Sequence, residues 1–576
     1  MLVYGDRMRE EKAGDVASGI AACLARVAAL PAGLARHAEL VAGFIRMAEL
    51  AQGLADARFA ARGMDERDPE SEAANRLLYE LAGMVGRSWD SRFCPQALPA
   101  GWRDRLDRLA TPERIAVKDA EGHAFYALYP EAYWAAARAS RLGPGTGVIG
   151  IRSIGTGLAA MVAAALGAPP AVTLRPMGHP FQRRVRIGSA LSRSLKAGPG
   201  PIAIADEGPG LSGSSFFSVA DWLGEAGFSP ERVHFFPSHA GPPGAEASPS
   251  HRASWARASK HVIGFDDLVV HASTPPHRLE HWIAGAVGKL DAPLRDISGG
   301  GWRAVCHGDE RDWPPADPAL EKRKVLAEAG GRRWLVKFAG LGAMAERKQG
   351  VQAHLADQGL AVKPAALVHG FTVEPWIAAS PLADAPAGPD ILAHLARYLA
   401  LRVTLPADAP GADPAALFAM AAHNLGAHFG GDAARRIGRA LGDPDRLALR
   451  PCNSDNRMHR WEWLAQGDGR LVKTDAVDHA RAHDLVGCQD IAWDIAGAGV
   501  EFGLDRATTM VLAGEVGARA RRAVSAPLLS AMTLCYLGFQ IGLWSMALAR
   551  QPDEGARIAP LLKRYAGHPA LDMLRA

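Results

Sequence analysis

Short apolar runs of β-forming residues alternate with helical stretches between about Thr111 and Asp267, and this alternation limits the possible folds more than any other feature. The runs are ERIAVKD, HAFYALYP, VIGI, AVTLRP, PIAIAD and ERVHFFPS. Strands separated by helices form mainly parallel sheets, because each crossover helix returns the chain to the same end of the sheet. Right-handed crossovers then bring the ends of the VIGI and IAIAD strands to one edge, where ligands usually bind. We therefore predict an α/β fold for this part.

The rest of the chain divides around this region. With 576 residues the chain is too long for one core. Apolar residues recur at helical spacing from Gly19 to about Ala61, which predicts a helical N-terminal module. The expected organisation is a helical module (1–110), an α/β domain with a parallel sheet (111–270), a linker (271–297) and an α+β domain (298–576).

Composition excludes several classes of function. The net charge is +4, and the chain has no Lys/Arg-rich run with interleaved aromatics, so we expect no nucleic-acid partner. Six scattered cysteines form no C-x-x-C pair, which favours a reducing cytoplasm and argues against structural zinc. The charged N-terminus does not have the apolar core of a signal peptide. The uncharged stretch 523–549 is long enough to span a bilayer, but its polar residues favour a buried helix and no membrane association.

Two adjacent carboxylates follow the PIAIAD strand. The segment 202–215 reads IAIADEGPGLSGSS, with Asp206 and Glu207 at the strand end and a loop of Gly, Pro and Ser after them. Such carboxylates can hold a ribose diol, directly or through Mg²⁺. The following backbone N–H groups, at the start of a helix, suit a phosphate dianion. The segment predicts a sugar-phosphate site; an ordinary strand-to-helix turn of a doubly wound sheet is the alternative.

The segment resembles the PRPP-binding motif of type I phosphoribosyltransferases. Gly213 and Ser214 stand where that family usually has Gly and Thr, although Glu207 replaces a frequent second Asp. The resemblance implies that Asp206 and Glu207 hold the ribose as the C1 bond breaks. The loop residues that would bind PRPP are Gly210, Leu211, Ser212, Gly213 and Ser214.

A second segment fits the same family. Residues 147–167, GVIGIRSIGTGLAAMVAAALG, read as strand, tight loop and Ala-rich helix, as in the family's pyrophosphate loop. By this resemblance the leaving diphosphate would be held by Arg152, Ser153, Gly155 and Thr156. The stretch MGHPFQRRVRIG lies where the family carries a mobile flap, and its arginines suit a substrate hood or a solvated loop.

The C-terminal part resembles the protein-kinase-like fold in its small-molecule phosphotransferase form. RRWLVKFAGLG places Lys337 in a β-rich run, where such enzymes keep the lysine that holds the nucleotide phosphates. Glu346, on the next helix, could pair with that lysine. VKPAALVHGFTVEPWI predicts two strands, with Glu374 and Trp376 at the adenine-binding hinge.

Farther along, NSDNRMHRWEWL and RLVKTDAVDH resemble a catalytic loop and a metal-binding strand. The resemblance implies Asp455 as the base or alcohol-orienting residue, with Asp475 and Asp478 as rival Mg²⁺ ligands. The departures are the absence of H-G-D, of the usual Asn after Asp455 and of a G-x-G-x-x-G before Lys337. The acidic and histidine residues here could instead form a metal cluster or a plain polar loop; they are Asp475, Asp478, His479, His483 and Asp484. In QDIAWDIAG, the better interpretation of Asp490 and Asp494 is structural.

Two functions follow from these resemblances. In the first, the protein is a phosphoribosyltransferase that uses PRPP and Mg²⁺ on an unidentified small-molecule acceptor, and an ATP-dependent kinase-like domain phosphorylates a related metabolite. In the second, a degenerate transferase domain senses ribose phosphates and regulates the kinase-like module. The transferase resemblance also implies a homodimer.

Overall fold

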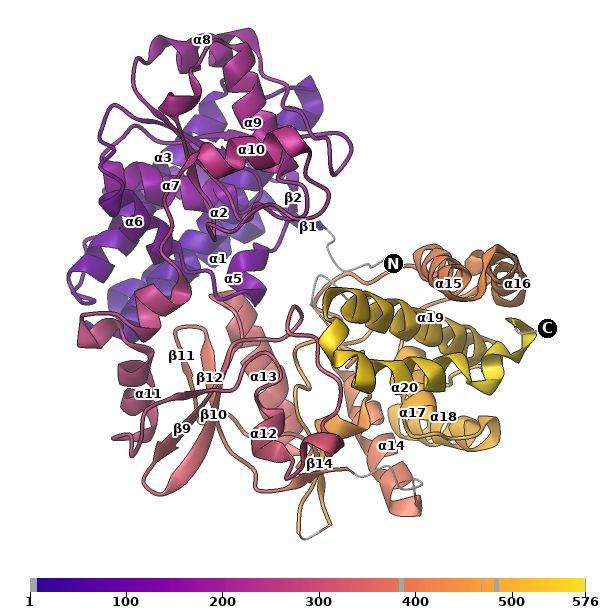
Figure 1. The fold of residues 1–576 in the computed structure, drawn as a ribbon. Helices are drawn as coiled ribbons and strands as arrows, with labels where there is room; N and C mark the ends of the chain where they lie inside the picture. Colours follow the sequence, from indigo (N-terminus) through magenta and orange to yellow (C-terminus); the bar gives the residue numbers. More distant parts are fainter. Residues whose placement is uncertain (1–7, 383–387, 468, 481–485, 575–576) are drawn as a thin grey trace.

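The computed structural model describes residues 8–382, 388–467, 469–480 and 486–574. Figure 1 shows three groups of elements: helices α1 to α10 at the top, strands β9 to β12 below them, and the C-terminal helices at the right. The predicted sites His483 and Asp484 lie outside the described residues.

The N-terminal group is helical, as the spacing of apolar residues predicts. Its helices are α1 (Ala13–Ala29), α2 (Leu34–Arg62), α3 (Pro69–Asp90) and α4 (Trp102–Leu109). Helix α3 begins where the Asp68 carboxylate accepts the Ser71 backbone N–H at 2.9 Å, with proline at the first helical position. Strand β1 (Arg9–Lys12) pairs antiparallel with β2 (Arg114–Val117), so the ERIAVKD run does form a strand, but apart from the main sheet.

A parallel five-stranded sheet follows, in the order β4-β3-β5-β6-β7. Its strands are β3 (Gly147–Ile151), β4 (Val172–Leu174), β5 (Ile202–Ala205), β6 (Val233–Phe236) and β7 (Ser259–Lys260). The helices of this part are α5 (Glu121–Phe125), α6 (Pro130–Ala139), α7 (Gly155–Leu166), α8 (Ser189–Ala197), α9 (Ser214–Glu225) and α10 (Pro249–Arg257). The parallel sheet is confirmed, but the strand expected in HAFYALYP is wrong, because its first residues form the end of α5.

The strand order reverses between β3 and β5. From β3 the chain crosses to β4 on one side, and from β4 it crosses back to β5 on the other side. This is the topological switch point of the sheet, the place where open α/β folds bind ligands. The segments that begin at Arg152 and at Asp206 both leave the sheet here.

A second, antiparallel sheet has the order β11-β12-β10-β9-β8. Its strands are β8 (Arg295–Asp296), β9 (Lys324–Ala329), β10 (Arg332–Phe338), β11 (Ala366–Val368) and β12 (Phe371–Pro375). Gly330 and Gly331 have positive φ angles of 58° and 69° and make the tight turn between β9 and β10. Helix α13 (Ala343–Asp357) follows β10.

The C-terminal group is mainly helical and carries the small sheet β13 (Ser380–Pro381), β14 (Trp463–Ala465) and β15 (Leu471–Lys473). Its helices are α14 (Pro389–Thr404), α15 (Pro414–Phe429), α16 (Gly431–Leu441), α17 (Ala492–Glu501), α18 (Arg506–Ala520), α19 (Ala526–Arg550) and α20 (Gly555–Ala566). Among the described residues α19 alone is long and apolar enough to cross a membrane, but 78% of its most apolar window is buried inside the fold.

The segment 271–297 is more than a linker. It contains α11 (Leu279–Val287), whose Leu279, Trp282 and Ile283 are buried, and strand β8 of the second sheet. One hydrophobic core runs from α1 to α3 through α7 to β9, β10 and β12. A second core fills the C-terminal helices. Short helical turns complete the fold: α12 (Arg303–Cys306), η1 (Pro230–Arg232), η2 (Asp266–Val270), η3 (Pro275–His277), η4 (Glu310–Asp312), η5 (Pro444–Arg446), η6 (Arg460–Glu462), η7 (Pro552–Glu554) and η8 (Pro569–Leu574).

Candidate functional site

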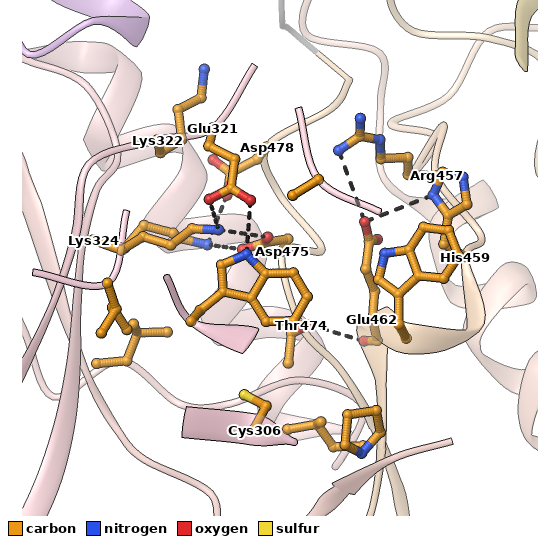
Figure 2. Close-up of a pocket in the computed structure, with 18 of the residues that line it drawn as sticks. Cys306, Glu321, Lys322, Lys324, Arg457, His459, Glu462, Thr474, Asp475 and Asp478 are labelled. Carbon is orange, nitrogen blue, oxygen red and sulfur yellow. Dashed lines mark hydrogen bonds and ion pairs between the residues drawn. The ribbon is translucent and has the colours of Figure 1, made fainter. Parts of the chain in front are cut away.

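A cavity of about 170 Å³ lies between the antiparallel sheet and the C-terminal helical group. Its walls come from β9, β10 and β12 on one side and from the segments 457–464 and 474–479 on the other. Figure 2 shows lysines and carboxylates meeting across this cleft, with Arg457, His459 and Glu462 at its other end. The cleft therefore combines buried charges of both signs with an opening between two parts of the fold.

Lys337 occupies the centre of the charged cluster. Strand β10 places its Nζ 2.8 Å from Asp475 Oδ1 and 2.7 Å from Asp478 Oδ2. Burial alone would lower the pKa of the ammonium group, but the two carboxylates outweigh it and hold the pKa well above its ordinary value. Lys337 therefore remains charged, and its partners come from the region that the sequence predicted to bind metal.

The two aspartates differ in their surroundings. Asp475 also lies 3.5 Å from Lys324 Nζ, whereas Asp478 lies 3.0 Å from Lys348 Nζ on α13. Asp478 is buried and Asp475 is half-buried; burial would raise the pKa of each carboxylate, yet the neighbouring lysines lower it. The more accessible of the two is Asp475, whose side chain lines the cavity with more exposure than that of Asp478.

The expected ion pair between Glu346 and Lys337 is not formed. Glu346 is exposed in the first turn of α13, while Lys348 on the same helix points inward to Asp478. A helix start so close to β10 turns Glu346 away from the strand. Asp478 thus takes the partner role that Glu346 was expected to play.

The predicted hinge residues divide between two surroundings. Glu374 is buried on β12 beside Lys337, and burial raises its pKa although Lys337 opposes that rise. Trp376 lines the cavity, and its backbone N–H donates to Arg333 O at 3.0 Å, so this amide belongs to the sheet edge. Glu374 therefore contributes to the charged cluster, and Trp376 to the cavity wall.

Asp455, the predicted base, does not reach the cavity. Its side chain is 0% exposed and accepts a hydrogen bond from Tyr398, with Lys473 Nζ at 3.5 Å. Burial would raise its pKa, but Lys473 and its other cationic neighbours lower it. The side chain holds the interior of the loop together, so the structure corrects its expected role as a base.

Asp494, at the start of α17, fixes the backbone of the same loop. Its carboxylate accepts the N–H groups of Asp455 at 2.7 Å and Asn456 at 2.8 Å. Burial, and then the nearby charge of Asp455, raise the pKa of Asp494 to about 7. The structural interpretation of Asp494 is confirmed. Farther along the chain, the loop presents three side chains to the cavity: Arg457, His459 and Glu462.

The connection from β8 to β9, residues 297–323 and here called the strap, lies along the cleft; the sequence has no glycine-rich hairpin before Lys337 that could do so. The strap lines the cavity with Trp302, whose indole N–H donates to Glu321 Oε1 at 2.7 Å. Arg303 of the strap forms two hydrogen bonds, 2.9 and 3.0 Å, with the Glu554 carboxylate in η7. Asp317 pairs with Arg550 at the end of α19. The strap therefore joins the sheet to the C-terminal helices across the cleft.

Carboxylate oxygens are the ligands that Mg²⁺ prefers. Asp475 presents a carboxylate to the cavity in the lysine cluster, and Glu462 presents one at the other end, so carboxylate oxygens of the type that ion prefers line the cleft. The described residues Asp455, Glu462 and His479 also bring one potential ligand atom each within 4.8 Å of one another.

The pair Asp206 and Glu207 lies at the switch point, at the end of β5. Asp206 is 8% exposed, and burial raises its pKa well above the ordinary carboxyl value. Burial also raises the pKa of Glu207, to about 7, and this side chain accepts the Gly122 N–H at 3.0 Å. Glu207 borders a cavity of about 150 Å³. The two acids are therefore packed into the protein more closely than an open ribose site requires.

The predicted diphosphate loop is held by its own neighbours. Arg152 forms ion pairs with Asp56 at 2.8 Å and with Asp65, which occupy its guanidinium. Ser153 Oγ lies 3.4 Å from Arg175, and Thr156 donates its backbone N–H to Ser153 O at 3.1 Å. At Gly155 an added Cβ would lie 2.6 Å from Ala205 O, so the two switch-point loops are in contact. Arg152 is thus a structural anchor between α2 and the sheet, a role the sequence did not reveal.

The predicted phosphate loop is closed by internal hydrogen bonds. The Gly213 N–H donates to Pro209 O at 2.9 Å, and the Ser214 N–H donates to Ser212 Oγ at 3.2 Å. Ser214 Oγ donates to Pro180 O at 2.6 Å, so the expected flap lies over the loop. Gly210 has a positive φ of 62°, and Leu211 projects outward and is exposed. Two of the amides expected to bind phosphate therefore have partners inside the protein.

Sequence reasoning missed several charged residues of the cleft. Lys324, Lys348 and Lys473 are buried among its carboxylates, although lysines at these places carry no recognised motif. The sequence carries no motif for Arg457 either; only the structure shows that it directly follows the two residues that Asp494 holds.

Comparison with known proteins gives distant likenesses only. No protein-family model and no curated protein matches the sequence. In fold, the chain is similar to choline kinase LicA from Streptococcus pneumoniae, with 17% identity over 42% of this chain and 90% of that one and a TM-score of 0.30. Spectinomycin phosphotransferase APH(9)-Ia, in complex with ADP and spectinomycin, shows 13% identity over 52% and 97%, with a TM-score of 0.33.

A thermostable mutant of aminoglycoside phosphotransferase APH(4)-Ia shows 14% identity over 50% of this chain and 100% of that one, with a TM-score of 0.30. None of these likenesses supports the phosphoribosyltransferase assignment. At such TM-scores the assignment of the cleft rests on its own side chains.

Proposed function

We propose that this protein is an ATP-dependent phosphotransferase that acts on a small molecule in the cleft between the antiparallel sheet and the C-terminal helices. The observation that carries the proposal is the contact of Lys337 Nζ with Asp475 Oδ1 at 2.8 Å, made between the two walls of the cavity. Phosphoryl transfer depends mainly on positioning and on neutralising phosphate charge. A lysine from the sheet can position the phosphates and neutralise part of their charge, and a carboxylate from the facing segment can hold a metal ion that neutralises the rest.

Each residue then has a defined task. Lys337 would hold the nucleotide phosphates, while Asp475 would hold Mg²⁺, which when bound neutralises charge on the transferring phosphoryl group. Trp376 forms a wall for the base of the nucleotide, and Trp302 of the strap shields the site from water. The buried network around Asp455 keeps the loop rigid.

The test is isothermal titration of the purified protein with Mg²⁺ and a non-hydrolysable ATP analogue. We expect Lys337→Met to weaken binding by about tenfold or more, because a charged hydrogen bond contributes about 1.5–3 kcal/mol. Arg435→Gln, which removes an exposed arginine paired with Asp432, is the control and should bind like the wild type. If wild type and Lys337→Met give the same affinity, or if neither binds, the proposal is wrong.

A phosphoribosyl site at the parallel sheet is the second candidate. It is supported by the position of Asp206 and Glu207 beside the loop at Gly155, at the switch point of the sheet. Two observations argue against this site: the guanidinium of Arg152 is occupied by an ion pair, and the pKa values of Asp206 and Glu207 are raised. Such a site would either transfer a phosphoribosyl group from PRPP or sense ribose phosphates.

Titration with PRPP and Mg²⁺ decides this second candidate. Binding by the wild type that is lost in Asp206→Asn and retained in Lys337→Met would support a separate site. Heats equal to those of buffer would rule out the phosphoribosyl site and would leave the proposal for the kinase-like cleft unchanged.

A further inference from the structure

The end of the cleft formed by the loop 453–462 carries an arginine to which no described residue comes closer than an ion-pair contact of 4.0 Å between side chains. Arg457 lines the cavity with 19% of its side chain exposed. Its nearest carboxylate contact among the described residues is Glu462 Oε1, 4.0 Å from Nη1. Its buried Nε has no hydrogen-bond partner in the described part of the chain. A guanidinium in this state is well suited to bind an anion.

His459 lies on the same wall and is also unsatisfied. Its side chain is 1% exposed, and neither ring nitrogen has a hydrogen-bond partner among the described residues. The nearest carboxylate oxygens are too distant for hydrogen bonds, at 3.9 Å in Glu462 and 3.8 Å in Glu501. A buried imidazole whose two nitrogens have no partner among the described residues can donate an N–H to a ligand in the cavity.

Glu462 does not neutralise Arg457, because another cation already holds it. Lys473 Nζ lies 2.6 Å from Glu462 Oε2 and 3.5 Å from Asp455 Oδ2. Arg402 also lies 3.7 Å from the Asp455 carboxylate. Arg402 and Lys473 thus lie beside the carboxylates of Asp455 and Glu462, whereas Arg457 has only the 4.0 Å contact with Glu462 among the described residues. The guanidinium of Arg457 is therefore the group that can bind a ligand.

The position of Arg457 has a chemical meaning. It directly follows the two residues whose backbone N–H groups Asp494 holds, and its side chain lines the cavity that Asp455 does not reach. A kinase catalytic loop presents to its acceptor an aspartate that accepts the proton of a hydroxyl group. An arginine cannot accept that proton. An acceptor that is already an oxyanion needs no base, and an arginine would bind it.

We propose that the acceptor in this cleft is an oxyanion, a phosphate or carboxylate group held by Arg457 and His459. This inference rests on the proposed phosphotransferase function and names the class of its substrate. A lone pair of the acceptor oxygen forms the new bond to the γ-phosphorus of ATP. The bond from that phosphorus to the β,γ-bridging oxygen breaks, and its electron pair leaves with ADP. No proton changes place, and the product is a phosphoanhydride or an acyl phosphate.

Binding tests the anion site without knowledge of the natural substrate. Protein saturated with Mg²⁺ and the non-hydrolysable ATP analogue is titrated with inorganic phosphate and, separately, with succinate. The wild type should bind one of them, and the stronger ligand distinguishes a phosphate from a carboxylate acceptor. Arg457→Gln should weaken that binding by about tenfold or more, and Arg457→Lys by less, because the charge is kept. Arg435→Gln is again the matched control.

The outcomes separate this inference from the proposed function. Unchanged anion binding in Arg457→Gln, or no anion binding by a wild type that binds the nucleotide, would overturn the oxyanion acceptor and leave the nucleotide cleft intact. Loss of nucleotide binding in the wild type would overturn the phosphotransferase itself. Thermal unfolding of each variant, with a midpoint near that of the wild type, shows that Arg457→Gln is folded.

The product gives an independent readout. The enzyme is incubated with ATP labelled in its γ-phosphate and a fraction of small metabolites, and the labelled product is heated in dilute acid. Release of the label as inorganic phosphate agrees with an anhydride or acyl phosphate. An acid-stable labelled phosphate monoester would show a hydroxyl acceptor and contradict the inference.

Discussion

At the scale of single residues, the charged partners in this protein decide which acids can act. The sequence predicted that Lys337 and Asp475 belong to one site, and the structure brings them together, because a strand lysine and a carboxylate after a strand reach the same cleft. The sequence could not show that Asp455 is sealed behind Tyr398 and Lys473. Burial depends on which helices pack over a loop, and the sequence of the loop alone does not reveal it.

Glu207 provides a test of burial at this scale. Its pKa is about 7 in the folded protein, above the ordinary value of 4.5. Because the pKa is raised on folding, proton binding by this carboxyl favours the folded state. The contribution is complete at pH values below the unfolded pKa of about 4.5 and is lost as the pH rises from about 4.5 to 7. Glu207→Gln should therefore raise the free energy of unfolding at pH 8 by about 1–3 kcal/mol and change it little at pH 4.

Urea unfolding of wild type and Glu207→Gln at the two pH values measures this effect. Glu10→Gln, at an exposed glutamate on β1, serves as the control. A variant that is less stable than the wild type at pH 8 would show that the ionised carboxylate is stabilising in the folded protein.

At the scale of elements, the pattern of apolar residues located most strands and the direction of their pairing, but it did not show which short segments join a sheet. The runs that became β3 to β6 were recognised from their apolar residues, and their parallel pairing followed from the helices between them. The segment 271–297 was predicted to be a linker, yet β8 joins the sheet through two residue pairs with β9. Such short pairing comes from tertiary packing and leaves little trace in the sequence.

The strap 297–323 makes a prediction at this scale. Arg303→Gln removes two hydrogen bonds to Glu554 and leaves that carboxylate without its main cation. We expect amide hydrogen exchange across the strap to rise by about tenfold or more, while exchange in β10 stays unchanged. Arg311→Gln, at an exposed arginine of the same strap, should leave the exchange as in the wild type. Equal exchange in both variants would show that the strap does not depend on this ion pair.

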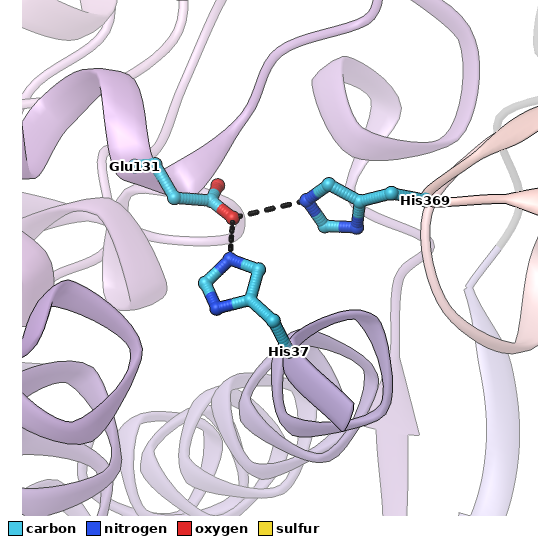
Figure 3. A group of neighbouring side chains, drawn as sticks. All are labelled: His37, Glu131 and His369. Atoms are coloured by element: carbon cyan, nitrogen blue, oxygen red, sulfur yellow. Dashed lines mark hydrogen bonds and ion pairs between the residues drawn. The ribbon is translucent and has the colours of Figure 1, made fainter. Parts of the chain in front are cut away.

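At the scale of the whole molecule, the parts predicted as separate domains share a core. Figure 3 shows a buried cluster at their meeting point, with His37 from α2, Glu131 from α6 and His369 from the turn between β11 and β12. Glu131 Oε1 lies 2.7 Å from His37 Nε2 and 3.1 Å from His369 Nε2. The two rings outweigh the effect of burial and lower the pKa of Glu131. No single segment of sequence could reveal this contact, because its members lie far apart along the chain.

Glu131→Gln tests whether the cluster joins these parts. The amide cannot accept two imidazole N–H groups with the strength of a carboxylate, so the contact should weaken by about 2–4 kcal/mol. Calorimetry should then show two separate unfolding transitions where the wild type and Glu10→Gln show one. A single transition at an unchanged temperature would mean that the shared hydrophobic core alone couples the parts.

Nucleotide binding in the cleft beside Lys337 can be observed in a crystal structure of the protein with Mg²⁺ and the non-hydrolysable ATP analogue. We expect phosphate density within hydrogen-bonding distance of Lys337 Nζ and a metal on Asp475. Nucleotide density at another place, or a cleft without density in crystals grown at saturating nucleotide, would show that this cleft is not the nucleotide site.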